Sequence, residues 1–388
     1  MKWTSKGYEN IICNKNISET TKFCIYGAGK LGGDLYKTLK HYDMFFCFID
    51  NNHSIQEKGY KNEAVISENE YFKKEIKYPV IICASDENTL LIESDLKNRG
   101  LIHNKNYYIC REFTDKLLPI IAYKFFNQTF MGLSQICVTE RCTLRCKKCA
   151  HGCYNVPITK DDLTLEQVKK SADIFFSKVN YIHEFVLIGG EPLLYKYLAD
   201  AVEYIGSKYR NQMSVFSITS NGTITPSKDL LEKCKEYGVL FRISNYSGTI
   251  AKLELQYEKL RKLFITNNVE FRISRKEHEW MDYGFEYYKR ECDNEQLIEV
   301  FDACHTSCHE IRENKFYYCV MARSVSDNLN FNVGKDDYLD FNQLTGKNWR
   351  RELLEYILGY SEKGYLDMCR YCHGADCYNY LIPAAQQL

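Results

Sequence analysis

Cysteine is the residue type whose number and spacing most clearly suggest chemistry in this chain. There are 18 cysteines among 388 residues. The opening stretch MKWTSKGYENIIC lacks the apolar region and cleavage site of an export signal, so we expect a cytoplasmic protein with free thiols rather than disulfides. Clustered free thiols are typical of metal sites. The clustered cysteines are Cys142, Cys146, Cys149 and Cys153 in one group, and Cys304, Cys308, Cys319, Cys369, Cys372 and Cys377 in another.

The first group contains the spacing C-x3-C-x2-C, formed by Cys142, Cys146 and Cys149. Three thiolates on a four-iron, four-sulfur (4Fe–4S) cluster leave one iron without a protein ligand, and that iron can bind a small chelating molecule. Two alternatives stay open on spacing alone. Cys153 can complete a ferredoxin-like run, although the first gap is x3 and Tyr154 replaces the usual proline. Four cysteines can also hold structural zinc.

A glycine-rich turn stands near the start of the chain, within strand and helix patterns that alternate over residues 20–112. This alternation predicts a small parallel sheet. Gly27, Gly29 and Gly32 form G-x-G-x-x-G between a strand pattern and a helix pattern, and Asp50 ends the next strand pattern. In a dinucleotide site, such a turn holds phosphate and the acid binds ribose hydroxyls. Because about 90 residues supply half of a complete dinucleotide fold, nucleotide binding and a purely structural or docking role both stay open.

A longer alternation over residues 132–276 contains five strand-like runs with helical patterns between them. It predicts a partial (β/α) barrel, whose chemistry should lie at the carboxyl ends of the strands. An apolar, aromatic-rich segment at 117–130 is expected to form a helix between the two alternations. Residues 309–319 predict a hairpin that turns at Glu313-Asn314.

A Gly-Gly-Glu-Pro segment, formed by Gly189, Gly190, Glu191 and Pro192, ends the strand pattern that follows the cysteine loop. Together with C-x3-C-x2-C after the first strand of the alternation, it resembles the signature of the radical S-adenosylmethionine (radical SAM) superfamily over about residues 132–275. The resemblance implies that the segment contacts the methionyl amino group of S-adenosylmethionine (SAM). Glycines expose backbone carbonyls, and we expect the carboxylate to face the ammonium.

The resemblance also implies a shell of cofactor-binding residues at the next two strand ends, namely Ser220, Asn221 and Ser244. Helix capping and turn chemistry are the alternative roles of these residues. The family usually has an aromatic residue before the third cysteine, packed on the adenine, but this chain has Lys148. We therefore expect the adenine to stack elsewhere or on the lysine stem.

The second group of cysteines resembles the SPASM or Twitch extension of the same superfamily, in which a hairpin and a following C-x2-C hold an auxiliary iron–sulfur cluster. Few residues follow the group, which favours one auxiliary 4Fe–4S cluster of the shorter Twitch kind. Asn314 stands where the family usually has glycine, and both residues tolerate a left-handed backbone. Structural zinc is the alternative. The best-fitting ligands are Cys304, Cys319, Cys369 and Cys372, with Cys308 and Cys377 as substitutes.

The resemblance implies an oxygen-sensitive enzyme of the oxidoreductase or mutase type. An electron from a flavodoxin or ferredoxin passes through the 4Fe–4S cluster into the sulfonium of SAM, which yields methionine and a 5′-deoxyadenosyl radical. The radical then takes a hydrogen atom from a substrate C–H bond, leading to oxidation, dehydration or epimerisation. The auxiliary cluster accepts an electron from the substrate radical or anchors the substrate. Epimerisation needs a thiol that returns hydrogen, and the candidates are Cys153 and whichever of Cys308 and Cys377 is unligated.

The substrate class rests on analogy with small Rossmann-like domains attached to sugar-modifying enzymes. It favours a carbohydrate or nucleotide-linked sugar as substrate, with NAD or a nucleotide-sugar at the N-terminal domain. The runner-up is a ribosomally made peptide, although peptide-modifying relatives often begin with a winged-helix domain instead. Alternatives of another class are an NAD-dependent Rossmann dehydrogenase with structural zinc and an electron carrier with closed clusters.

The amino-acid composition limits the class of protein and the partners that this chain can have. Hydrophobic residues make up 45% and charged residues 26%, as in soluble globular proteins. Lys plus Arg and Asp plus Glu each number 51, and this balance argues against nucleic acid or an anionic membrane as the main partner. No apolar run approaches the roughly 18 residues of a membrane span. We therefore predict an α/β protein with a Rossmann-like domain (1–115), a radical SAM partial (β/α)6 barrel (116–300) and a SPASM/Twitch-like domain (301–388).

Overall fold

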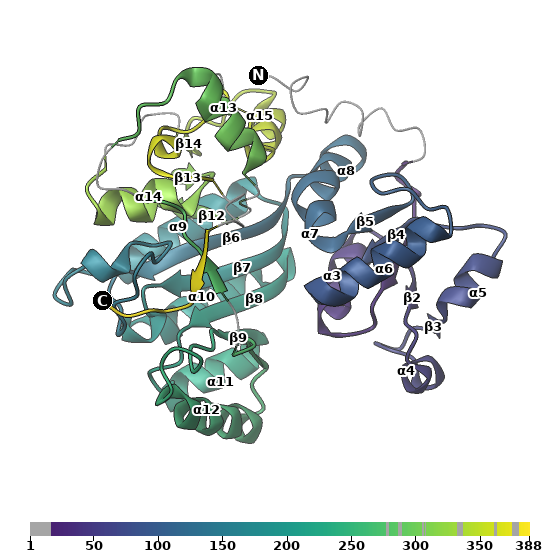
Figure 1. The fold of residues 1–388 in the computed structure, drawn as a ribbon, viewed down its shortest axis with the longest axis horizontal. Helices are drawn as coiled ribbons and strands as arrows, with labels where there is room; N and C mark the ends of the chain where they lie inside the picture. Colours follow the sequence, from purple (N-terminus) through teal and green to yellow (C-terminus); the bar gives the residue numbers. More distant parts are fainter. Residues whose placement is uncertain are drawn as a thin grey trace. The chain divides into compact units, whose positions relative to one another are not determined.

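The computed structural model describes residues 17–276, 279–285, 289–304, 306, 308–331, 337–360, 363–374 and 380–388. These residues form two compact units, with the boundary between Gly132 and Leu133. Parallel sheets with helices packed on them build both units (Figure 1), so the predicted α/β class with parallel sheets is confirmed. In the part of the chain that the structure describes, no helix combines the length and the apolar composition needed to cross a membrane.

The first unit is built on a five-stranded sheet in the order β3-β2-β1-β4-β5, and every pair of neighbours is parallel. Its central strand β1 is buried along its whole length, as expected for a parallel sheet covered on both faces. The strands are β1 (Phe23–Tyr26), β2 (Phe45–Ile49), β3 (Val65–Ile66), β4 (Val80–Ile82) and β5 (Tyr107–Ile109). The helices are α3 (Lys30–His41), α4 (His53–Lys58), α5 (Glu68–Lys73), α6 (Asp86–Asn98), α7 (Cys110–Glu112), the π-helix η1 (Phe113–Leu117) and α8 (Leu118–Phe126).

The helix expected over residues 117–130 is present as α8, and it belongs to the first unit. Aromatic packing explains why this unit extends beyond the predicted boundary at residue 115. The ring centroids of Tyr42 and Phe126, at the end of α8, lie 5.0 Å apart.

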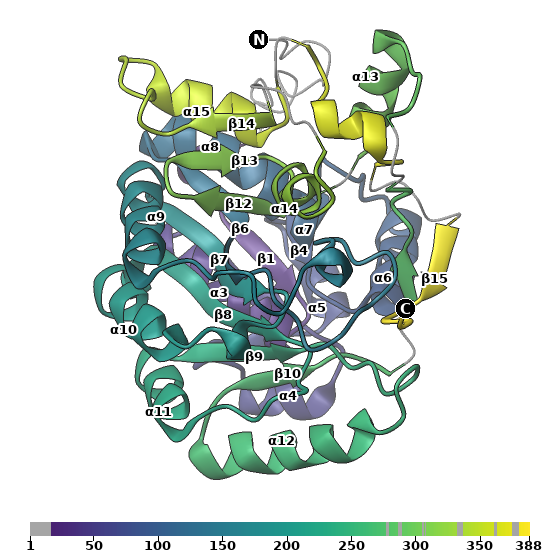
Figure 2. The same ribbon diagram turned by 90° about the vertical axis from the view of Figure 1, so that its left-hand side faces the viewer.

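The second unit is built on an eight-stranded sheet in the order β10-β9-β8-β7-β6-β12-β13-β14, which Figure 2 shows from bottom to top. The pairs β7/β8, β8/β9, β9/β10 and β6/β12 are parallel, whereas β12/β13 and β13/β14 are antiparallel. Helices α9, α10 and α11 lie in a row along one side of this sheet. The strands are β6 (Phe130–Thr139), β7 (Tyr181–Gly189), β8 (Met213–Ser220), β9 (Val239–Ile243), β10 (Phe271–Ile273), β12 (His309–Arg312), β13 (Lys315–Tyr317) and β14 (Tyr338–Asp340). The first helices are η2 (Cys153–Asn155), α9 (Leu165–Lys178), η3 (Pro192–Leu194), α10 (Leu198–Tyr209), η4 (Arg210–Gln212), α11 (Lys228–Tyr237) and α12 (Leu253–Asn267).

The predicted hairpin over residues 309–319 is confirmed, because β12 and β13 pair antiparallel around Glu313-Asn314. The left-handed residue of the turn is Glu313, with φ 52°, rather than Asn314. Since β12 also pairs with β6, the hairpin continues the sheet, and the predicted third domain does not form a separate compact unit. The remaining elements are β11 (Glu279–Met281), which pairs antiparallel with β15 (Leu381–Pro383), and the helices α13 (Asn294–Ala303), α14 (Val320–Asn328), α15 (Trp349–Ile357) and η6 (Asp367–Tyr371).

Candidate functional site

A cavity of about 380 Å³ lies at the carboxyl ends of β6, β7, β8 and β9. Parallel strands present their carboxyl ends at one edge of a sheet, so residues far apart in sequence meet there. The predicted residues that line this cavity are Cys142, Cys146, Cys149, Gly189, Gly190, Ser220, Asn221 and Ser244. The structure therefore brings together the cysteine motif, the glycines of the Gly-Gly-Glu-Pro segment and the predicted cofactor shell.

Cys149 has an environment suited to a thiolate. A hydrogen bond from the Cys153 thiol, together with backbone N–H groups of residues 151–153, outweighs burial and lowers the pKa of Cys149 to about 7. Donors gathered around one sulfur stabilise its ionised form, which is the form that binds metal.

The sulfurs of Cys142 and Cys146 also accept hydrogen bonds. The backbone N–H of Leu144 lies 3.5 Å and the Asn221 side-chain amide 3.6 Å from Cys142 Sγ. The Gln387 side-chain amide lies 3.2 Å from Cys146 Sγ. Burial raises the pKa of Cys142 to about 11 and that of Cys146 to about 12, so these thiols stay protonated until a positively charged group binds them. The set of soft sulfur donors with N–H partners fits an iron–sulfur cluster.

Cys153 lies behind Cys149 rather than on the cavity wall. Its side chain is 5% exposed, its thiol donates to Cys149, and it is absent from the described residues that line the cavity. A hydrogen donor to a substrate must reach the cavity, so this position does not favour the predicted catalytic role of Cys153. It also leaves three of the four clustered cysteines on the wall.

The Gly-Gly-Glu-Pro segment packs tightly against the start of the cysteine loop. The backbone N–H of Glu191 donates to the Arg141 carbonyl at 2.8 Å, and a Cβ atom at Gly190 would clash with that same carbonyl. Only glycine therefore allows the two backbones to approach so closely.

The side chain of Glu191 differs from our expectation, because it turns away from the cavity toward the end of β8. It is fully buried and accepts hydrogen bonds from Ser220 Oγ at 2.8 Å, the Asn221 N–H at 2.9 Å and the Leu193 N–H at 3.1 Å. Burial outweighs these bonds and raises the pKa of Glu191 to about 7. Pro192 is buried at the start of η3, and neither Glu191 nor Pro192 is among the described residues that line the cavity.

Aromatic residues that no sequence pattern indicated form another wall of the cavity. Tyr246 follows β9 and Trp280 lies in β11, and their ring centroids are 5.5 Å apart at an interplanar angle of 90°. Lys148, which occupies the position usually held by an aromatic residue, has φ 57° and pairs with Asp282 at 3.2 Å. The ion pair places the Lys148 ammonium beside the segment that carries Trp280.

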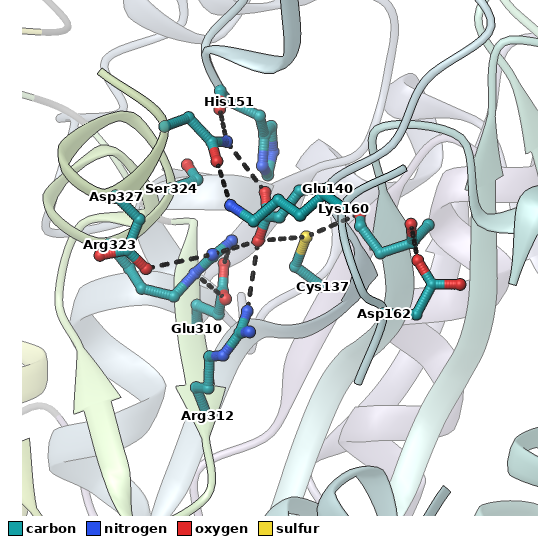
Figure 3. Close-up of polar contacts among 12 residues, drawn as sticks. Cys137, Glu140, His151, Lys160, Asp162, Glu310, Arg312, Arg323, Ser324 and Asp327 are labelled. Atoms are coloured by element: carbon teal, nitrogen blue, oxygen red, sulfur yellow. Dashed lines mark hydrogen bonds and ion pairs between the residues drawn. The ribbon is translucent and has the colours of Figure 1, made fainter. Parts of the chain in front are cut away.

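A buried ionic network lies behind the cysteine loop (Figure 3). The Arg323 guanidinium on α14 pairs with Glu140 and Glu310, and all three side chains are at most 3% exposed. Arg312 pairs with Glu140 at 3.2 Å, and the Asn328 amide donates to it at 3.0 Å. Although burial alone raises the pKa of Glu140, Arg323 and these partners lower it to about 2. The network therefore holds an ionised carboxylate two residues before Cys142.

Comparison with known proteins agrees with this geometry. Residues 136–253 match the family described as the Radical SAM superfamily. This segment of the chain is therefore similar to a radical SAM domain. The match includes the three cysteines of the cavity, the Gly-Gly-Glu-Pro segment and the ends of β8 and β9.

The individual proteins that match this chain are similar to it over a short segment or at low sequence identity. GTP 3',8-cyclases of Rhizobium etli and Rhizobium leguminosarum bv. trifolii are 32% identical over 89 residues, which are 23% of this chain. The chain spans about a quarter of the length of these curated relatives. Similar solved structures include native anSMEcpe with bound AdoMet (14% identity, 66% of this chain, 93% of that chain, TM-score 0.38). Another is BtrN in complex with AdoMet and 2-DOIA (16% identity, 66% of this chain, 100% of that chain, TM-score 0.36).

The second group of cysteines lies C-terminal to the radical SAM domain. Cys304, Cys319, Cys369 and Cys372 line one small cavity of about 20 Å³ with apolar neighbours. Burial raises the pKa of Cys319, Cys369 and Cys372, that of Cys369 to about 12. Cys308 is absent from the described residues that line this cavity, and Cys377 lies outside the described residues. The described residues contain no group of three or more His, Cys, Asp or Glu side chains placed to hold a metal ion.

The first unit has a cavity of its own, of about 570 Å³, at the glycine turn. Gly27, Gly29 and Asp50 line it, whereas Gly32 lies within α3 and is absent from the described residues that line it. Gly27 has φ 115°, and a Cβ there would clash with the Cys83 carbonyl. A Cβ atom at Gly29 would meet no atom within 4 Å. Asp50 accepts the Ala28 N–H at 2.8 Å, which fixes its carboxylate at the cavity wall.

Proposed function

We propose that this protein is a radical SAM enzyme that holds a 4Fe–4S cluster on Cys142, Cys146 and Cys149 and binds SAM beside it. One observation carries the proposal: these three cysteines share a cavity with Gly189 and Gly190 at the carboxyl edge of the sheet. When bound, the cluster supplies the electron that splits SAM into methionine and a 5′-deoxyadenosyl radical. That radical abstracts a hydrogen atom from the substrate, and a flavodoxin or ferredoxin serves as the electron donor.

Different residues of the cavity bind different parts of SAM. The backbone of Gly189 and Gly190 offers carbonyl oxygens to the methionyl ammonium, while Ser220, Asn221 and Ser244 supply polar contacts. Glu191 acts indirectly, because its buried carboxylate fixes Ser220 and Asn221. Tyr246 and Trp280 provide the apolar ring contact for the adenine that Lys148 does not supply, and because their rings are perpendicular, one of the two stacks on the base. The aromatic wall also excludes water from the radical.

We further propose an auxiliary 4Fe–4S cluster of the Twitch kind on Cys304, Cys319, Cys369 and Cys372. Their common apolar cavity supports this assignment, with Cys308 and Cys377 as substitute ligands and structural zinc as the alternative. The auxiliary cluster would take an electron from the substrate radical, giving net oxidation, or anchor the substrate.

A carbohydrate or nucleotide-linked sugar is the substrate class that we favour. The cavity of the first unit supports it, because a glycine turn, the amino end of α3 and Asp50 suit the phosphate and ribose of a nucleotide-sugar or NAD. The name of the curated relatives, GTP 3',8-cyclase, shows that one enzyme with a similar segment acts on a nucleotide. A ribosomally made peptide is the second candidate substrate.

SAM cleavage tests the central proposal. The full chain is purified without oxygen, reconstituted with iron and sulfide, and mixed with SAM and dithionite. We expect release of 5′-deoxyadenosine from the wild type and from the control Cys234→Ala, in which a buried cysteine of α11 is changed. Cys142→Ala should release none. Stoichiometric zinc without SAM cleavage would instead favour a zinc-stabilised dehydrogenase or a purely structural role for the cysteines.

A further inference from the structure

The segment after β15 lies directly against the cysteine loop, although about 240 residues separate the two in sequence. The Lys147 N–H donates to the Gln386 carbonyl at 2.7 Å, and the Leu388 N–H donates to the Arg145 carbonyl at 2.9 Å. Thr249 Oγ1, in the loop after β9, donates to the Ala384 carbonyl at 2.6 Å. The segment is therefore fixed both to the cysteine loop and to the edge of the sheet.

Gln387 is the residue of this segment that reaches a cluster cysteine. Its side-chain amide nitrogen lies 3.2 Å from Cys146 Sγ and 2.7 Å from the Ala385 carbonyl, and its side-chain oxygen accepts the Arg145 N–H at 2.8 Å. An amide group has two N–H donors and one carbonyl. The network uses all three groups.

The same contacts fix which way the amide points. In the reversed orientation, the side-chain oxygen would face the Ala385 carbonyl and Cys146 Sγ, and the amide hydrogens would face the Arg145 N–H. Both contacts would be repulsive, so the orientation with N–H toward sulfur is the one that satisfies every group.

A hydrogen bond to a ligand sulfur stabilises the reduced state of an iron–sulfur cluster, because reduction adds negative charge that the N–H dipole favours. We propose that Gln387 is a positioning residue that raises the reduction potential of the cluster on Cys146 by donating an N–H to that sulfur. The proposal rests on the proposed function, since it requires a cluster at this site. It assigns the tuning of the radical SAM cluster to a residue far outside the matched domain.

Two substitutions of Gln387 distinguish the effect of its side-chain N–H donors from the effect of its other contacts. Gln387→Ala removes the whole amide, whereas Gln387→Glu keeps an oxygen for the Arg145 N–H, loses the N–H donors and adds a negative charge. Gln386→Ala is the matched control. The Gln386 side chain is exposed, and its backbone carbonyl, which accepts the Lys147 N–H, is unchanged by the substitution.

The test is an anaerobic redox titration of the reconstituted full chain, followed by electron paramagnetic resonance, with iron and sulfide measured in each sample. The signal that changes when SAM is added identifies the cluster beside the cavity. We expect both Gln387 variants to shift its potential to more negative values with unchanged iron content, and Gln386→Ala to match the wild type.

Three results would overturn the proposal: an unchanged potential in both variants, a shift only in Gln387→Glu, or loss of iron as the sole effect. The second result would mean that the new charge acts rather than the missing donor, and the third that the segment only secures the loop. A wild type that holds iron and cleaves SAM while Gln387→Ala keeps its potential would leave the proposed function intact. A wild type without a SAM-responsive cluster would contradict both the role of Gln387 and the proposed function.

Discussion

The carboxylate of Glu191 accepts a 2.9 Å hydrogen bond from the backbone N–H of Asn221, and this bond joins the ends of β7 and β8. Asn221 in turn directs its side-chain amide to Cys142 Sγ at 3.6 Å. The conspicuous acid of the Gly-Gly-Glu-Pro segment is therefore a buried brace that holds two walls of the cavity together. Its effect on SAM passes through Asn221 and the cysteine loop.

Replacing this brace should destabilise the protein and open the site. In Glu191→Ala, the three buried donors from Leu193, Ser220 and Asn221 lose their acceptor, and each unsatisfied donor costs about 1–3 kcal/mol. Thermal unfolding should show a clear loss of stability, together with weaker SAM binding. Glu191→Gln keeps one acceptor oxygen and should fall between Glu191→Ala and the wild type. Equal stability of the alanine variant and the wild type would contradict this role.

The buried network of Figure 3 predicts a large penalty for removing Arg323. Arg323→Met leaves Glu140 and Glu310 without their buried partner, and breaking such a pair costs about 3–5 kcal/mol. Arg312→Met is the matched control, because this arginine also pairs with Glu140 but its side chain is 30% exposed. Anaerobic thermal unfolding should show the larger loss for Arg323→Met. Comparable losses in the two variants would argue against the central place of Arg323.

Iron analysis distinguishes the two groups of cysteines. We expect roughly eight irons per reconstituted wild-type chain and roughly four in Cys369→Ser, because the auxiliary cluster would lose a ligand. Cys308→Ser should keep the wild-type count, since Cys308 does not line the apolar cavity among the described residues. Cys369→Ser should still release 5′-deoxyadenosine from SAM. An iron content of about four per wild-type chain would contradict the presence of the second cluster.

Local sequence patterns predicted the parts of the site that are local in the chain. The C-x3-C-x2-C spacing and the Gly-Gly-Glu-Pro segment are each local in the chain, and periodicity predicted the strands that they follow. The assignment of Ser220 and Ser244 to the site followed from the resemblance to the radical SAM superfamily. Cys304 and Cys369 were grouped through resemblance to a known hairpin arrangement. The parallel sheets followed from apolar runs that alternate with amphipathic helices.

The contacts that sequence did not predict join distant segments. Arg323 meets Glu140 across 183 residues, and Gln387 meets Cys146 across 241 residues. No period of 2.0 or 3.6 residues encodes such contacts, because tertiary packing alone brings the partners together. The direction of the Glu191 side chain was missed for a related reason. The motif identifies a carboxylate, but the buried donors of β8 decide where it points.

Buried His309 should make stability depend on pH. Burial lowers the pKa of this side chain to about 4, although a hydrogen bond to the Tyr318 carbonyl opposes the shift. In the unfolded chain the pKa is near 6.5, so the unfolded state gains a proton first as pH falls. The contribution of His309 is complete above about pH 6.5 and decreases toward pH 4, by about 3 kcal/mol.

Comparison with His309→Asn isolates this effect, because the asparagine amide can still donate to the Tyr318 carbonyl and does not titrate. Urea unfolding of both proteins between pH 4 and pH 8 should give a stability difference that favours the wild type most above pH 6.5. A difference that is independent of pH would show that folding does not change the pKa of His309.

The cavity of the first unit should bind a nucleotide through the amino end of α3. Gly29 is the N-cap of this helix, and a Cβ atom there would meet no atom within 4 Å, so we expect Gly29→Asp to fold. Aspartate is a favourable N-cap, but its charge occupies the position where a phosphate would meet the helix N–H groups. Calorimetry with UDP-sugars and with NAD should show binding to the wild type by one class and none to the variant. Absence of binding to the wild type by either class, with SAM cleavage retained, would assign this unit a structural or docking role.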